Sequence, residues 1–95
     1  MHARVSRYSG DADALAAGFE AVTEELSRTD GFVQAYFLTD HEASRALSIT
    51  LWESKEALDA SATAAHRMRT RATEPSSATI DGVESFAVVL TASPG

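Results

Sequence analysis

Residues 45–58 read RALSITLWESKEAL, a stretch that combines the pattern of a β-strand with that of a helix start. In its first half, leucine or isoleucine occupies every second position, as the two-residue period of a strand requires. Ser54 then stands where a helix N-cap is expected, because its hydroxyl can accept a hydrogen bond from the first free N–H groups of a helix. A strand over residues 45–52 and a helix over residues 55–73 are therefore predicted.

The chain before this stretch shows the same alternation of strand and helix patterns. Residues 3–8 are predicted to form a strand, and Asp11 can cap a helix that runs to about Thr29. One apolar stripe follows the face of that helix: Leu15, Phe19, Val22 and Leu26. A second strand is predicted over residues 32–39, after Gly31, which suits the left-handed backbone of a helix C′ position.

The chain after this stretch completes the pattern. The helix over residues 55–73 should end near Pro75, and its inner stripe is expected to be Leu58, Ala62, Ala65 and Ala72, with Met68 beside it. A last strand is predicted over residues 79–91, with a bend at Gly82. The order strand, helix, strand, strand, helix, strand predicts an α+β, ferredoxin-like fold with an antiparallel sheet, in a single domain over residues 1–95.

Both faces of the predicted sheet are apolar. The two expected faces of the second strand are Phe32, Tyr36 and Leu38 against Val33, Ala35 and Phe37. Those of the last strand are Phe86, Val88 and Leu90 against Val83, Ala87 and Val89. Two helices cover only one face of a four-stranded sheet, and a large exposed apolar face is unusual in a monomer. We therefore expect a homodimer in which a second copy covers the other face.

Composition argues against several classes of partner and site. Eight basic and fourteen acidic residues give a net charge of −6, which argues against nucleic acid or an anionic membrane as partner. The absence of cysteine excludes disulfides and thiolate metal sites. Residues 40–42 (DHE) carry metal-compatible side chains, but three consecutive residues do not readily converge on one ion, so no metal is expected. Arg67, Arg69 and Arg71 divide between two helix faces and are expected to complement the helix C-terminus.

The chain shows no pattern typical of export or membrane insertion. Residues 1–4 lack the apolar stretch of a signal peptide, and the longest apolar run, residues 86–90, falls short of the roughly 20 residues that a membrane span needs. A cytoplasmic protein is expected. Seven arginines against one lysine, with no asparagine, indicate a GC-rich bacterial genome.

Residues 45–58 also resemble the strand-into-helix signature of the antibiotic biosynthesis monooxygenase-like proteins, the dimeric α/β-barrel superfamily. Residues 30–33 (DGFV) resemble the turn of that family in which a glycine–aromatic pair starts the second strand. With element order and length, the resemblance covers nearly the whole chain. It implies a homodimer and a small aromatic or quinol-type substrate. The superfamily also contains haem-degrading and other members, so the resemblance does not fix the activity.

The resemblance implies roles for individual residues. In the cofactor-independent oxygenases of the superfamily, a tryptophan at the end of the third strand works with an asparagine four residues earlier. Trp52 matches the tryptophan, and Ser48 stands in place of the asparagine on the same face of the strand. Haem-degrading relatives use an asparagine on the first strand, where Ser6 or a neighbour stands, and a second tryptophan, where Ser61 stands. Only His66 remains as a possible haem ligand, so no cofactor is expected.

The candidate catalytic residues are therefore Trp52, Ser48 and His66, and Tyr8 and Tyr36 join Trp52 and Ser48 as candidates for substrate binding. The indole N–H and the hydroxyls can hold a substrate anion, and His66 can accept a proton. Each residue also has a structural interpretation: Trp52 caps the core, His66 packs at the edge of the helix stripe, and the tyrosines are core aromatics with their hydroxyls at the rim.

Two functions remain open from the sequence. The first is a cofactor-independent monooxygenase-like enzyme, whose substrate, an anthrone or hydroquinone, reduces dioxygen itself once it is deprotonated. The second is a non-catalytic homodimer that binds a small apolar ligand or another protein. A closed pocket in which the Trp52 N–H and a titratable group converge favours the first, and a filled cleft with internally satisfied polar groups favours the second.

Overall fold

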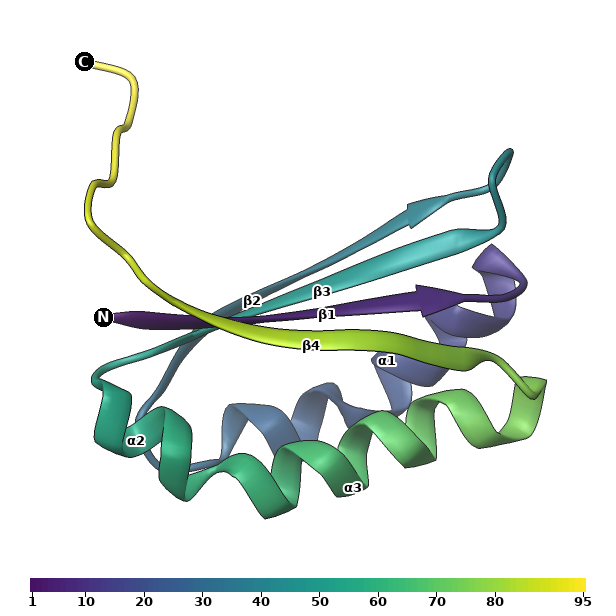
Figure 1. Cartoon of the computed structure of the whole chain (residues 1–95), viewed down its shortest axis with the longest axis horizontal. Helices are drawn as coiled ribbons and strands as arrows, with labels where there is room; N and C mark the ends of the chain where they lie inside the picture. The colour runs from purple at the N-terminus through teal and green to yellow at the C-terminus, as the bar shows by residue number, and fades with distance from the viewer.

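The computed structural model describes residues 1–95 and has the predicted order of strands and helices (Figure 1). The elements are β1 (His2–Ser9), α1 (Ala12–Ser27), β2 (Phe32–Asp40), β3 (Arg45–Trp52), α2 (Lys55–Ala60), α3 (Ala62–Thr73), the 3-10 turn η1 (Glu74–Ser76) and β4 (Thr79–Ala87). The strands form one antiparallel sheet in the order β2-β3-β1-β4. All helices lie on one face of this sheet (Figure 1), which confirms the α+β, ferredoxin-like fold.

The core lies between the sheet and the helices. The predicted stripe of α1 is buried: Leu15, Phe19, Val22 and Leu26. Phe19 stacks on Phe37 of β2 at 4.8 Å between ring centroids and meets the Tyr8 ring edge-on at 5.1 Å. A Cβ added at Gly18 would lie 2.1 Å from the Ala72 carbonyl oxygen, so α1 and α3 approach each other more closely than a side chain would allow.

The predicted helix over residues 55–73 is interrupted at Ser61, so the expectation of one continuous helix is wrong. In a continuous helix the Leu58 carbonyl accepts from the N–H of residue 62. Here that carbonyl accepts from the Arg4 guanidinium at 2.9 Å and from the Ser61 hydroxyl at 2.7 Å. Ser61 is buried and Ala62 is exposed, so Ala62 does not belong to the inner stripe. None of the helices has the length and apolarity needed to cross a membrane.

The second strand begins with an irregularity that the alternating pattern does not predict. The register with β3 shifts between Phe32 and Gln34, which leaves Val33 as an extra residue in the ladder. Phe32 pairs with Trp52 and packs edge-on against its ring at 5.7 Å. The prediction that Phe32 shares a face with Tyr36 is therefore wrong.

The two glycines singled out in the sequence both mark turns or bends. Gly31 has the expected left-handed backbone, with a φ of +79°. It is not the C′ residue of α1, however, because the C-cap of that helix is Arg28 and a short turn separates the two. The ladder between β1 and β4 is irregular at Asp81, next to Gly82, which confirms a bend at that point.

The last strand ends at Ala87, earlier than the predicted end at Thr91. Beyond it, the Val88 N–H still donates to the Met1 carbonyl at 3.0 Å. Residues 89–90 are almost fully exposed.

The sheet face opposite the helices is mostly apolar, although it also carries Arg7, Gln34 and Glu84, and this chain does not cover it. By register, the apolar residues on it are Ala3, Val5, Tyr36, Leu38, Leu47, Ile49, Leu51 and Phe86; we call this set the outer face. Tyr36, Leu38 and Phe86 are 50 %, 47 % and 50 % exposed.

Candidate functional site

A cavity of about 40 Å³ lies between the sheet and the helices. The lining residues are Arg4, Ser6, Tyr8, Phe19, Val22, Leu26, Phe37, Ser48, Thr50, Trp52, Ala65, Met68 and Arg69. Its polar lining comes mainly from the even-numbered positions of β1 and β3, because side chains two residues apart share one face of a strand. The helices add apolar side chains and one arginine. We call Arg4, Ser6, Tyr8, Ser48 and Thr50 the polar wall of the cavity, and Phe19, Phe37 and Trp52 its aromatic wall.

Trp52 ends β3 and is fully buried. Its indole N–H donates to the Thr50 hydroxyl at 2.9 Å, which supplies the acceptor that a buried tryptophan needs. The ring packs against Phe32 on one side and lines the cavity on another. Trp52 therefore packs in the core and borders the cavity at the same time.

Tyr8 and Ser48 form a buried pair across the sheet. The Tyr8 hydroxyl and Ser48 Oγ lie 3.0 Å apart and share a hydrogen bond, and their residues are only 2 % and 6 % exposed. Both side chains line the cavity beside Phe19. The structure thus brings together three of the predicted site residues, Tyr8, Ser48 and Trp52.

Arg4 of β1 is a buried cation on the polar wall and is only 5 % exposed. Its guanidinium donates to Ser61 Oγ at 3.1 Å and to the Leu58 carbonyl at 2.9 Å, and it lies 5.7 Å from the centroid of the Trp52 ring. Burial lowers the pKa of Arg4, and the nearby charge of Arg69 lowers it further. Arg4 was missed in the sequence, although it shares a strand face with Ser6 and Tyr8.

Arg69 of α3 lies on the opposite side of the cavity and was also missed as a site residue. Its Nε is buried with no hydrogen-bond acceptor, and burial lowers the pKa of its guanidinium. Helical spacing could have identified Arg69 as an inward-facing residue. It follows Ala65 by four residues and precedes Ala72 by three, which places it on the inner stripe.

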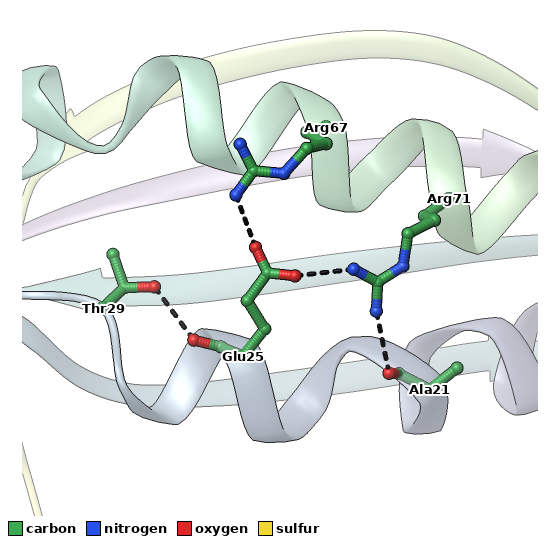
Figure 2. Close-up of polar contacts among 5 residues, drawn as sticks. All are labelled: Ala21, Glu25, Thr29, Arg67 and Arg71. Atoms are coloured by element: carbon green, nitrogen blue, oxygen red, sulfur yellow. Dashed lines mark hydrogen bonds and ion pairs between the residues drawn. The ribbon is translucent and has the colours of Figure 1, made fainter.

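Glu25 of α1 ties the helix layer together beside the cavity (Figure 2). It accepts from Arg67 and from Arg71 at 2.6 Å each, and Arg71 also donates to the Ala21 carbonyl at 3.3 Å. These hydrogen bonds hold the pKa of Glu25 below its usual range. Arg67 and Arg71 were expected to complement the end of their own helix, but they pair with α1 instead, and Arg69 faces the cavity.

Two predicted site residues are not brought to the cavity. Tyr36 lies on the outer face, where its hydroxyl accepts from Gln34 Nε2 at 2.7 Å. His66 is exposed on α3 and does not line the cavity. No three histidine or carboxylate side chains lie close enough together to hold a metal ion.

Fold and site together define a small α+β, ferredoxin-like protein with an aromatic cavity between its sheet and its helices. The family model of antibiotic biosynthesis monooxygenases matches residues 1–73, which is most of the chain. The chain therefore belongs to the antibiotic biosynthesis monooxygenase family. Comparison with curated protein sequences found no match.

Solved structures of similar fold support this assignment at the level of architecture. SnoaB, a cofactor-independent oxygenase from Streptomyces nogalater, superposes with a TM-score of 0.75 at 18 % identity, covering 95 % of this chain and 94 % of its own. A monooxygenase from the gene ActVA-Orf6 of Streptomyces coelicolor, in complex with nanaomycin D, gives 0.69 at 16 % identity, covering 99 % and 92 %. Rv0793 from Mycobacterium tuberculosis gives 0.71 at 21 % identity, covering 97 % and 98 %. At these identities the likeness shows the fold alone.

Proposed function

We propose that this protein is a cofactor-independent monooxygenase-like enzyme that oxidises a small, electron-rich aromatic of the anthrone or quinol type in the cavity beside Trp52. The observation that carries the proposal is the cavity itself: its lining combines three aromatic rings, those of Phe19, Phe37 and Trp52, with several hydroxyls and two guanidiniums. Apolar walls with a few convergent polar groups are typical of small-molecule sites. Family membership and the two oxygenases among the similar structures support the same reaction class.

The chemistry balances without a cofactor. An anthrone loses a proton from its ring methylene, and the resulting carbanion passes electrons to dioxygen. The methylene carbon becomes a carbonyl, a four-electron oxidation in which one oxygen atom enters the product and the other leaves as water. The protein has to bind the ring, favour its anion and exclude bulk water.

Residues that line the cavity can perform the first two of these tasks, binding the ring and stabilising its anion. The aromatic wall can stack against a flat substrate ring, as offset or edge-on aromatic pairs do. Tyr8, Ser48 and Thr50 offer hydroxyls on the polar wall, and each can rotate from its present partner toward a substrate oxygen. In this proposal Ser48 does the work that the family resemblance assigns to an asparagine, with a shorter side chain.

The cavity has to open before a ring can enter. Its volume of about 40 Å³ is small, whereas a cavity that holds benzene measures roughly 150 Å³. Met68 and Arg69 on α3 carry long side chains with several rotatable bonds, so they are the lining residues best able to move aside. Substrate binding is therefore expected to displace these two side chains.

Oxygen uptake tests the proposed activity. Purified protein is mixed with anthrone in air-saturated buffer without added cofactor, and dioxygen is followed with an electrode. Uptake above the spontaneous rate, with anthraquinone as product, is expected, and Trp52→Phe and Tyr8→Phe should lower it. Uptake equal to the spontaneous rate for every anthrone and hydroquinone tried would rule the activity out.

A non-catalytic ligand-binding role is the second candidate, and one observation favours it. The hydroxyls and the indole N–H of the cavity are already paired with one another: Tyr8 with Ser48, and Trp52 with Thr50. A site with satisfied polar groups is typical of a packed cleft. Ligand binding without any oxygen uptake would favour this function over the enzyme.

We also propose that the protein forms a homodimer through the outer face. The helices cover only the opposite side of the sheet (Figure 1), and Tyr36 and Leu38 on β2 and Phe86 on β4 are half exposed on the outer face. A second copy would remove this apolar surface from water. The proposal agrees with the dimeric architecture that the family resemblance implies.

A further inference from the structure

The basic side chains of this protein divide into two groups. The sequence contains seven arginines and one lysine. Six of these eight residues pair with a carboxylate: Arg7, Arg28, Arg45, Lys55, Arg67 and Arg71. Arg4 and Arg69 form no such ion pair, and both line the cavity beside Trp52. The two basic residues of the chain without a carboxylate ion pair therefore lie at one site.

The partners of these two guanidiniums are neutral or absent. Arg4 donates to the Ser61 hydroxyl and the Leu58 carbonyl, neither of which carries a charge. Arg69 has a buried Nε with no acceptor. Buried charges in proteins are normally paired, because removing an ion from water without a counter-charge costs several kcal/mol.

The two cations also act on each other. Burial lowers the pKa of both side chains, and the charge of Arg69 lowers that of Arg4 further, which the charge of Asp59 offsets only in part. An arginine nevertheless remains protonated at neutral pH. The site thus holds two like charges beside aromatic rings, an arrangement that a bound anion would relieve.

We propose that the cavity binds its aromatic ligand as an anion, with a negatively charged oxygen of the ligand held between Arg4 and Arg69. Guanidinium groups bind carboxylates and phenolates through short, charge-assisted hydrogen bonds, and the orphaned Arg69 Nε supplies one donor. The ring of the ligand then lies against Trp52, on which Arg4 is already stacked.

This inference deepens the proposed function by naming the charge of the substrate, and it rests on the same cavity. The negative oxygen has two chemical sources, a carboxylate carried by the ring or a phenolate formed from a hydroquinone hydroxyl. With either source, Arg69 would select anionic ligands over neutral ones by its charge. Trp52 and Ser48 carry no charge and cannot make this distinction.

Paired probes of equal shape test the charge. Binding of 2-naphthoate and of its neutral analogue 2-naphthamide is measured by isothermal titration calorimetry at neutral pH. The anion is expected to bind about tenfold more tightly or better, as a charge-assisted bond in a partly buried site allows. Arg69→Gln should remove most of this preference, because it should weaken the binding of naphthoate far more than that of naphthamide. Arg67→Gln, which removes the same charge from an exposed position on the same helix, should change neither affinity.

A second pair of measurements covers the phenolate source and the fold. The absorbance of 2-naphthol reports its ionisation, and binding to the protein should lower the pKa of the naphthol hydroxyl in the unmodified chain but not in Arg69→Gln. If the naphthol pKa falls but naphthoate is not preferred, the ligand is a phenolate. If naphthoate is preferred but the naphthol pKa does not change, the ligand is a carboxylate. Arg4 is buried, so its removal risks unfolding the chain, and Arg4→Lys is used because it keeps the positive charge. This variant should retain part of the preference for naphthoate over naphthamide.

The proposal is overturned if naphthoate and naphthamide bind with equal affinity and naphthol keeps its pKa, if none of the probes binds at millimolar concentration, or if Arg67→Gln matches Arg69→Gln. Oxygen uptake is measured separately. If anions bind in an Arg69-dependent way but no oxygen is consumed, the oxygenase function is excluded and the anion site stands. If oxygen is consumed but anions are not preferred, the anion site is excluded and the oxygenase function stands.

Discussion

At the scale of single residues, the site depends on buried polar groups that satisfy one another. The even spacing of Ser48 and Trp52 predicted that they share a strand face, and the structure places both at the cavity. Their partners could not be predicted in the same way. The bond from Tyr8 to Ser48 depends on the register of β1 against β3, and the alternating pattern of one strand does not encode that register.

Arg4 and Arg69 show a different limit of prediction from sequence. Their positions on inward-facing stripes are visible in the sequence, but charged residues are ordinarily assigned to the solvent side. The lack of a carboxylate partner, which makes them informative, emerges only from the folded chain. Tyr36 and His66 were misplaced for the converse reason, since a residue type typical of active sites does not determine which way its side chain points.

Ser48→Ala is expected to destabilise the protein by about 1–3 kcal/mol, because it leaves the buried Tyr8 hydroxyl without a partner. Urea unfolding measures this cost. In the Tyr8→Phe background the same substitution should cost less, since both members of the pair are then gone. Equal costs in the two backgrounds would mean that the hydrogen bond contributes nothing to stability.

At the scale of elements, the order and type of every predicted helix and strand are confirmed, and the errors lie at their ends and breaks. The break in the predicted helix has a cause outside the local sequence. The helix breaks at Ser61, where the Arg4 side chain, distant in the sequence, binds the Leu58 carbonyl. The last strand ends at Ala87, before the predicted end at Thr91.

Gly18→Ala tests the close approach of α1 and α3. Alanine is the better helix former by about 1 kcal/mol, but the new Cβ would overlap the Ala72 carbonyl, a backbone group that cannot rotate away. Overpacking of this kind typically costs about 1–3 kcal/mol, so a net loss of stability is expected in urea unfolding. Gly82→Ala is the matched control, since its Cβ would meet no atom within 4 Å. Increased stability of Gly18→Ala would contradict the packing.

Glu25 makes the helix layer sensitive to acid. Because Arg67 and Arg71 lower its pKa in the folded state, its contribution to stability is present above the pKa of the unfolded chain and is lost as the pH falls through the folded value. Glu25→Gln should therefore be less stable than the unmodified protein at neutral pH, by a modest amount because the pair is partly exposed. Thermal unfolding from neutral to acidic pH should show the difference shrinking. A difference that stays constant across this range would contradict the assignment.

At the scale of the whole molecule, the asymmetry between the two sheet faces is the main feature. One face is covered by α1, α2 and α3, and the outer face is left to solvent by this chain (Figure 1). The apolar character of both predicted sheet faces, with helices enough to cover only one of them, predicted this division. The bulge at Val33, which moves Phe32 to the helix side, was not predicted because it depends on pairing between strands.

Ile49→Lys tests the proposed dimer at the centre of the outer face. A charge at this position would be buried in the interface, so sedimentation should show a dimer for the unmodified protein and a monomer for the variant. Ala62→Lys, on an exposed helix position, is the control and should remain dimeric. A monomeric unmodified protein at micromolar concentration would contradict the proposal.

The cavity beside Trp52 is the central claim, and the single tryptophan reports on it directly. Trp52 emission is recorded while anthrones and hydroquinones are added to the purified protein. Saturable quenching at micromolar ligand is expected, weakened in Ser48→Ala, because a bound ring would contact the indole and the Ser48 hydroxyl. Blue-shifted emission that no ligand alters would show that Trp52 is only a packed core residue and that no aromatic substrate binds beside it.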